Sequence, residues 1–260
     1  MNRIEKKFRQ LKKQGKKAFI AFITAGYPDL NTTAGLIREF SKIGVDIIEL
    51  GVPFSDPLAD GAVIQESSQY ALKKGINLDK ILNLVKSARK NTNTPICLMS
   101  YYNPIFCFGQ EKFVKKALSC GVDGVIIPDL PAEEGKLLGV YANKYGLDTV
   151  FFLAPTSSIK RIKSVAKKTR GFIYYVSLTG VTGTRKELSK DFIRQVKLIK
   201  RYTDKPVCLG FGVSTPQQVR QVSRVADGVI VGSAIIRKIK ENIGRPDLVK
   251  KVTAFVSRLK

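Results

Sequence analysis

The stretch DIIELGVPFSDPLADGAVIQ, residues 46–65, joins a predicted strand with one carboxylate to a loop with another. Residues 45–50 are mostly apolar and predict the strand, and Glu49 shares one face of it with Val45 and Ile47 because side chains alternate. A loop rich in Gly, Pro, Ser and Asp then leads to Asp60, eleven residues later. Burying an ionisable group is costly unless it is paired or its pKa shifts. Glu49 is therefore a candidate catalytic residue, and a structural Glu–Lys pair is the alternative.

The pattern of this stretch recurs along the chain. A small or acidic residue, an apolar run and a turn follow one another in GVDIIELG (44–51), GVDGVIIPD (121–129), LDTVFFLAP (147–155) and ADGVIVGS (226–233). Eight apolar strands are predicted in all, at 18–23, 45–50, 96–100, 122–127, 148–153, 172–176, 206–210 and 227–231. Helices are predicted near 2–14, 32–43, 78–90, 110–119, 132–145, 157–168, 190–201, 215–224 and 246–259. Apolar strands that alternate with helices indicate parallel βαβ units.

Eight such units predict a (β/α)₈ barrel of the α/β class, formed by residues 1–260 as a single domain with an extra N-terminal helix. A doubly wound open sheet is the alternative. In a barrel, functional groups gather where strands end. Glycine-rich segments follow the last three predicted strands, at VTGT (181–184), GFG (210–212) and GSA (232–234), the last of which opens a helix. Such loops bind phosphate through backbone N–H groups and a helix N-terminus, unless these glycines serve only tight turns. The long loop at about 177–189 has the length of a lid, or is a connection without a role.

The composition limits the possible chemistry. The chain has no histidine, which excludes Ser-His-Asp and Cys-His schemes and His-ligated metal sites. Its four cysteines, Cys97, Cys107, Cys120 and Cys208, form no CxxC pair, so we expect buried free thiols and no metal site. No apolar run approaches the length of a membrane span, and the N-terminus is unlike a signal peptide. We expect a cytoplasmic protein, or a plastid stromal one if the chain is organelle-encoded.

The formal net charge of +24 raises the possibility of nucleic-acid binding. Lys and Arg are spread over the whole chain at helical spacings, however, and no zinc-finger or RNP pattern is present. Solvated helix faces explain this distribution better, and the positive electrostatic field of these residues would also attract an anionic small-molecule substrate. We therefore expect neither a nucleic-acid partner nor a membrane partner.

The sequence resembles the alpha subunit of tryptophan synthase over nearly its whole length. The resemblance is carried by ELGVPFSDPLADG (49–61), FITAGYP (22–28), SYYNPI (100–105), GVDGVIIPDLP (121–131), VSLTGVTGTR (176–185), GFGVSTPQQV (210–219) and VADGVIVGSAII (225–236). It implies a (β/α)₈ barrel that cleaves indole-3-glycerol phosphate to indole and glyceraldehyde 3-phosphate without a cofactor of its own. It also implies a partner, a beta subunit that carries pyridoxal phosphate, in a tetramer of two alpha and two beta chains.

The resemblance assigns roles to individual residues. The family's catalytic carboxylates match Glu49 and Asp60, its lid threonine matches Thr182, and Asp56 with Pro57 matches the loop that faces the beta subunit. Its phosphate-binding groups match Gly183, Gly212, Gly232 and Ser233. Its indole pocket matches Phe22, Met99, Ile126, Tyr174, Val176 and Phe211, with Tyr101 near the reacting side chain.

The sequence departs from the family at Ala62, where a proline is common, which predicts a freer loop after strand 2. Three alternatives remain open at this stage. The first is a free-standing indole-3-glycerol-phosphate lyase. The second is a nucleic-acid-binding barrel, in which the two carboxylates would have no function. The third is a catalytically silent partner, which the presence of both carboxylates disfavours.

Overall fold

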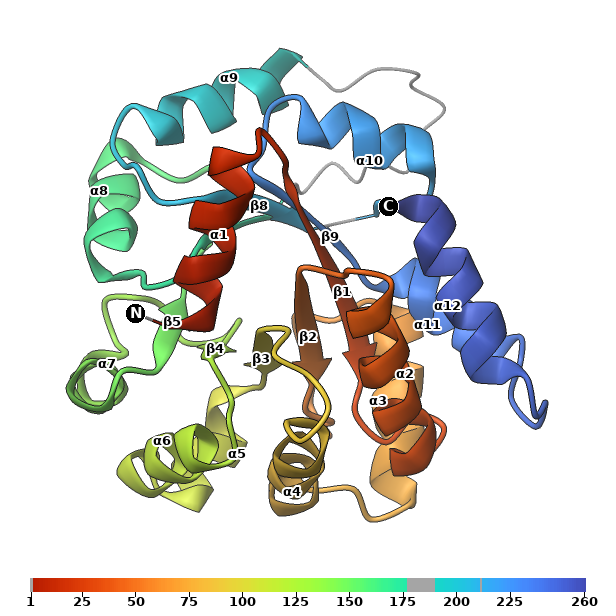
Figure 1. Ribbon diagram of the computed structural model, residues 1–260. Coiled ribbons are helices and arrows are strands. Elements are labelled where there is room, and N and C mark those ends of the chain that lie inside the picture. Colours follow the sequence, from red (N-terminus) through yellow and green to blue (C-terminus); the bar gives the residue numbers. More distant parts are fainter. Residues whose placement is uncertain (1, 177–189, 211) are drawn as a thin grey trace.

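The computed structural model describes residues 2–176, 190–210 and 212–260. Within these ranges, nine parallel strands form one sheet surrounded by helices (Figure 1). The strands are β1 (Ala18–Thr24), β2 (Ile47–Gly51), β3 (Ile96–Met99), β4 (Gly124–Ile126), β5 (Asp148–Val150), β6 (Phe152–Leu153), β7 (Ile173–Val176), β8 (Val207–Gly210) and β9 (Gly228–Val231). None of the helices in the described ranges has the length and apolar character needed to cross a bilayer.

The sheet curls into a barrel. Its strand order is β5-β4-β3-β2-β1-β9-β8-β7-β6, and β5 and β6 belong to one stretch of chain interrupted at Phe151. The first half of this stretch pairs with β4 and the second half pairs with β7. The predicted fifth strand, 148–153, is therefore two short strands that join the ends of the sheet. This confirms the predicted (β/α)₈ barrel, and the open doubly wound sheet is wrong.

The helices are α1 (Arg3–Lys13), α2 (Leu30–Lys42), α3 (Ala62–Lys73), α4 (Leu78–Ala88), α5 (Tyr102–Phe108), α6 (Gln110–Ser119), α7 (Lys136–Tyr145), α8 (Ile159–Lys168), α9 (Lys190–Lys200), α10 (Pro216–Ser223), α11 (Ser233–Lys240) and α12 (Leu248–Leu259). The sequence did not predict α3 and α5. Helix α3 follows a loop rich in Gly and Asp, so the sequence pattern did not show where the helix begins. Helix α5 contains Pro104 in its first turn, where proline is tolerated. The second strand also begins two residues later than predicted, at Ile47.

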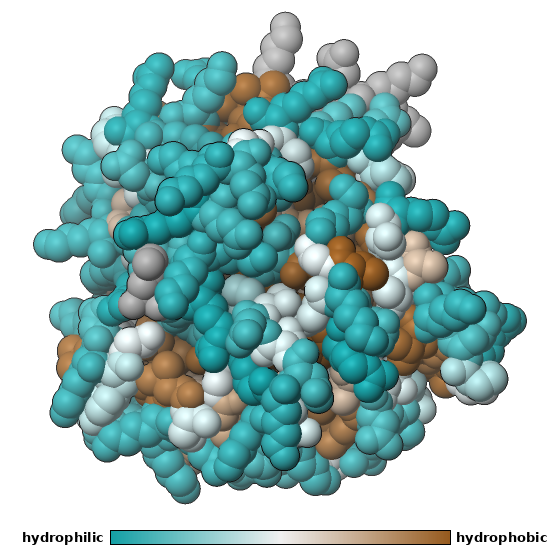
Figure 2. Space-filling model, in the orientation of Figure 1, coloured by the Kyte–Doolittle hydropathy of each residue, from teal (hydrophilic) through white to brown (hydrophobic). Residues whose placement is uncertain are grey.

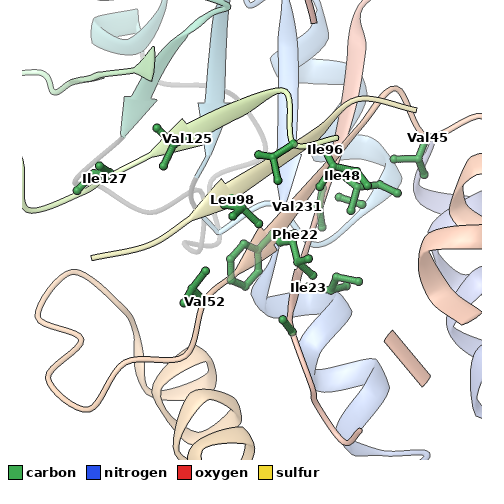
Figure 3. Close-up of a cluster of buried hydrophobic side chains, with 14 of the residues drawn as sticks. Phe22, Ile23, Val45, Ile48, Val52, Ile96, Leu98, Val125, Ile127 and Val231 are labelled. Carbon is green, nitrogen blue, oxygen red and sulfur yellow. The ribbon is translucent and has the colours of Figure 1, made fainter. Parts of the chain in front are cut away.

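Alternate residues of each strand form two separate apolar layers. The outward-facing side chains of the strands pack against the surrounding helices, and Figure 3 shows part of this layer, including Ile48, Leu98 and Val125. The inward-facing side chains fill the barrel as a second cluster that includes Ile47, Cys97, Ile126, Tyr174, Cys208 and Ile230. Glu49 lies on this inward face, two residues after Ile47.

Helix α1 closes the N-terminal end of the barrel. Ile4, Phe8 and Leu11 belong to the same cluster as the barrel interior, and the Phe8 and Phe172 rings lie 5.9 Å apart. Figure 1 shows α1 lying across the mouth of the barrel. Helix α1 therefore covers the barrel interior at this end, opposite the carboxyl ends of the strands near which Glu49 lies.

The acidic residues of the internal repeat lie at the N-terminal end of the barrel and pair there with basic side chains. They are Asp46, Asp123, Asp148 and Asp227, and each lies within 3.6 Å of a Lys or Arg nitrogen. Asp123 accepts hydrogen bonds from Arg89 at 2.6 Å and from the backbone N–H of Ile96 at 2.9 Å. Because these groups lie opposite the catalytic end, the repeated Asp is a structural feature of the fold.

Candidate active site

Glu49 is a fully buried carboxyl group near the carboxyl end of β2. It lies in register between Phe22 on β1 and Cys97 on β3. Neither of its carboxylate oxygens has a hydrogen-bond partner among the described residues, so the structural Glu–Lys pair is absent from this part of the chain. Burial, and secondarily the charge of Asp60, raises the pKa of Glu49 to about 8. Glu49 is therefore mainly protonated at neutral pH and is suited to act as a proton donor.

Asp60 lies in the loop between β2 and α3, and Tyr101 holds this loop. The Tyr101 hydroxyl accepts a hydrogen bond from the backbone N–H of Ala59 at 2.9 Å, and the Tyr101 ring stacks on Phe54 at 5.2 Å. Burial raises the pKa of Asp60 to about 6, and a hydrogen bond from Tyr101 opposes this rise. Asp60 is therefore mainly ionised at neutral pH.

The two carboxyl groups thus differ in protonation state at the same pH. The negative charge of Asp60 contributes to the raised pKa of Glu49. A pair of titratable groups whose pKa values differ in this way is typical of acid–base active sites. The arrangement provides one proton donor and one negative charge at the carboxyl end of the barrel.

Glycines make room for the aromatic walls of the site. A Cβ at Gly51 would lie 2.7 Å from Cζ of Phe22, and a Cβ at Gly232 would lie 3.2 Å from its Cδ1. A Cβ at Gly210 would collide with the hydroxyl of Tyr174. Both ring positions therefore depend on residues without side chains. The sequence analysis did not single out Gly51 and assigned Gly210 only to a phosphate-binding loop, although a glycine within a strand often marks such a close approach.

The predicted pocket residues Phe22, Met99, Ile126, Tyr174 and Val176 come from four strands of the barrel, β1, β3, β4 and β7. The Tyr174 and Phe152 rings lie 4.7 Å apart, and Met99 and Val176 pack against the cluster that contains Ile126 and Tyr174. Phe22 and Tyr174 are buried, with 4% and 9% of their surfaces exposed. The structure therefore brings these residues together as an apolar lining around Glu49, as a flat aromatic substrate requires.

Two of the predicted phosphate-binding segments lie beside each other at the ends of β8 and β9, which are paired strands. Gly212 has a φ of 70°, which favours glycine. Gly232 is the N-cap of α11, and this helix has no side chain that caps its N-terminus. Ser233 is its first residue, so its backbone N–H has no acceptor within the helix. This uncapped N-terminus has the form of an anion-binding site.

Three predicted site residues, Thr182, Gly183 and Phe211, lie outside the described residues. Their roles, and that of the predicted lid at 177–189, stay predictions.

Two polar contacts that the sequence did not predict hold the loops of the site in place. The hydroxyls of Thr24, at the end of β1, and Ser67, on α3, are 2.7 Å apart in a buried position. The carboxylate of Asp129, after β4, accepts a hydrogen bond from the N–H of Tyr102 at 2.9 Å. The PDLP motif that contains Asp129 is visible in the sequence, but only the tertiary structure shows that Asp129 bonds to Tyr102.

The loop after β2 also presents an exposed surface beside the site. The Ser55 hydroxyl donates to Asp56 at 2.5 Å, and Leu58 is 92% exposed. Pro57 is partly buried between them. Among the described residues, no group of three or more Cys, Asp or Glu side chains is arranged to hold a metal ion.

A (β/α)₈ barrel with a protonated and an ionised carboxyl group at the carboxyl ends of its strands defines an acid–base enzyme of the barrel class. The family model described as "Tryptophan synthase alpha chain" matches residues 8–260. The chain belongs to this family, whose members are lyases that cleave indole-3-glycerol phosphate.

Curated relatives and solved structures agree with this placement. The tryptophan synthase alpha chain of Geotalea uraniireducens is 51% identical over 260 residues, which cover all of this chain and 97% of that protein. The subunit alpha structure from Legionella pneumophila superposes with a TM-score of 0.93 at 37% identity, covering 100% of this chain and 97% of that one. A chain from a structure of the tryptophan synthase a2b2 complex of Pyrococcus furiosus gives a TM-score of 0.87 at 40% identity, covering 93% of this chain and 97% of that one.

Proposed function

We propose that Glu49 and Asp60 carry out the retro-aldol cleavage of indole-3-glycerol phosphate. The observation that carries this proposal is the isolated, fully buried carboxyl group of Glu49, whose pKa is raised to about 8. A buried group without a hydrogen-bond partner among the described residues lowers stability, and such a cost is typical of catalytic groups. Phe22 and Tyr174 provide the apolar walls beside it for an indole ring.

Glu49 donates a proton to C3 of the indole ring, which weakens the bond between C3 and the glycerol side chain. The positive charge that develops at the indole nitrogen is stabilised by the ionised carboxylate of Asp60. As the carbon–carbon bond breaks, the adjacent glycerol hydroxyl becomes an aldehyde and its proton returns to Glu49. Indole and glyceraldehyde 3-phosphate leave, and Glu49 is again protonated. These steps need no cofactor on this chain.

The substrate phosphate binds at the carboxyl ends of β8 and β9. The N–H groups of Gly212, Gly232 and Ser233 provide the donors, joined by Gly183 in the preceding loop. The N-terminus of α11 adds a partial positive charge directed at the dianion. The phosphate is the end of the substrate remote from the indole ring, so this proposed site holds the glycerol phosphate end.

A beta subunit, carrying pyridoxal phosphate, is the partner that receives indole, in a tetramer of two alpha and two beta chains. The support is the likeness to a chain of the Pyrococcus furiosus structure, which is described as a mutually activated a2b2 complex. The loop with Asp56, Pro57 and the exposed Leu58 directly precedes Asp60 in the chain and is the proposed contact. A free-standing lyase is the alternative, since its cleavage chemistry would use the same residues.

The test is an indole-release assay with purified protein and indole-3-glycerol phosphate, with and without a beta subunit. Glu49→Gln keeps the size of the side chain but has no proton to donate, so indole release falls to background. Glu134→Gln, at an exposed site on the loop before α7, is the matched control and keeps full activity. Substantial turnover by Glu49→Gln would refute the catalytic assignment. Wild-type activity that a beta subunit leaves unchanged would favour the free-standing lyase.

A further inference from the structure

The end of the barrel opposite Glu49 contains a hollow of about 370 Å³ between α1 and the start of β8. Phe8 and Leu11 on α1 and Pro206 before β8 form its apolar floor. The volume is within the range of pockets that hold small molecules, about 300–1,000 Å³. Since α1 covers the barrel interior at this end, this hollow is separate from the proposed active site.

Five lysines line this hollow, namely Lys12, Lys16, Lys17, Lys200 and Lys205, together with two acidic residues, Asp204 and Asp227. The local formal charge is therefore +3, the difference between these two groups. The ammonium group of Lys17 lies 3.3 Å from the carboxylate of Asp227, and that of Lys200 lies 2.8 Å from the same oxygen. Both lysines are thus held by an internal partner.

The other three lysines are available to a ligand. Lys12, Lys16 and Lys205 make no ion pair with any described residue, and they come from α1, the turn after it and the segment before β8. The face of the molecule on which α1 lies is covered largely by hydrophilic side chains (Figure 2). A lining that combines apolar residues with three lysines free of ion pairs to the described residues differs from a solvated helix face, because it offers both charge and a surface for carbon atoms.

We propose that this hollow binds an organic phosphate that carries two or more negative charges and an apolar body, such as a nucleoside diphosphate. The phosphate groups contact Lys12, Lys16 and Lys205, and the ring or sugar packs on Phe8, Leu11 and Pro206. The site does not depend on the proposed function of the carboxyl end of the barrel, since no residue is shared between the two.

Isothermal titration calorimetry at physiological ionic strength with ADP as the probe tests this site. The charge-reversal variant Lys16→Glu/Lys205→Glu is compared with Lys160→Glu/Lys250→Glu, which changes the net charge equally at exposed lysines outside the hollow. We expect the first variant to bind ADP at least tenfold more weakly than wild type, and the second to stay close to wild type. Indole release without ADP is unchanged in both, because neither pair belongs to the catalytic machinery.

Equal weakening in the two variants would show that ADP follows the overall charge and would overturn the proposal. So would ADP binding that survives in Lys16→Glu/Lys205→Glu, since the ligand would then lie elsewhere. Pyrophosphate serves as the second probe, because it has the charge of ADP without the apolar body. We expect ADP to bind more tightly than pyrophosphate, and equal affinities would contradict the role of the apolar floor.

Discussion

The hydroxyl of Tyr101 accepts a hydrogen bond from the backbone N–H of Ala59, one residue before Asp60. Tyr101 follows β3 and Asp60 follows β2, so this contact joins the loops of two adjacent strands. The same hydroxyl lowers the pKa of Asp60 against the effect of burial. Tyr101 therefore positions Asp60 and keeps it ionised.

Tyr101→Phe should raise the pKa of Asp60 above about 6, because a hydrogen bond to the ionised form is lost. A smaller fraction of Asp60 is then ionised between pH 6 and 7, so the acidic limb of the kcat profile moves to higher pH. A pH series of indole release measures this shift. Tyr102→Phe, one residue further on, is the control and leaves the profile in place; an identical profile for Tyr101→Phe would contradict the positioning role.

Glu49→Gln should change how stability depends on pH. The folded pKa of about 8 lies above the ordinary value of 4.5, so the stability that Glu49 contributes is complete below pH 4.5 and is lost as pH rises to about 8. As pH rises through this window, the free energy of unfolding of the variant therefore increases relative to that of wild type by about 1.4 kcal/mol per pH unit. Urea unfolding at several pH values gives the slope. Parallel curves for the two proteins would show that Glu49 titrates normally.

Ser233→Pro removes the one N–H group that the phosphate proposal assigns to the first residue of α11, a helix position where proline is tolerated. A hydrogen bond to a charged group contributes about 1.5–3 kcal/mol, so KM should rise roughly tenfold or more. Ser233→Ala keeps the N–H and separates the contribution of the hydroxyl. Steady-state kinetics with both variants tests the prediction, which fails if Ser233→Pro retains the wild-type KM.

Gly210→Ala should displace Tyr174, because the added Cβ would lie 2.2 Å from its hydroxyl oxygen. Overpacking of this kind typically costs about 1–3 kcal/mol of stability, and the displaced ring should raise KM. Gly139→Ala on α7 is the matched control, since its Cβ meets no atom within 4 Å, and it should stabilise the helix by about 0.5–1 kcal/mol. Thermal melts and kinetics are compared, and a wild-type KM in Gly210→Ala would contradict the spacing role.

Asp123→Ala should lower stability without changing kcat. Asp123 is 3% exposed, and its loss leaves the Arg89 guanidinium, which is 10% exposed, without its carboxylate. Breaking a buried pair in this way typically costs about 3–5 kcal/mol. Urea unfolding and indole release measure the two effects separately. A loss of kcat in protein that remains folded would show that this end of the barrel takes part in catalysis.

Local pattern in the sequence was sufficient to predict the barrel. Runs such as ICLM in β3 and GVIV in β9 are apolar at every position, because each strand is covered by helices outside and filled by side chains inside. Their alternation with helical stretches defines βαβ units before any long-range contact is known. The repeated acidic residue before each apolar run likewise marked the strand starts, although its structural role appeared only with partners such as Arg89.

The properties of the site depend on residues that are distant in the sequence. The raised pKa of Glu49 arises because strands β1 and β3 exclude water from both sides of β2, which a local pattern cannot show. Tyr101 reaches Ala59 across 42 residues for the same reason. Helix α3 was missed because packing against β1 and α11, more than local propensity, stabilises it. Local sequence therefore specifies the strands, whereas the closed barrel creates the protonation states on which the proposed chemistry depends.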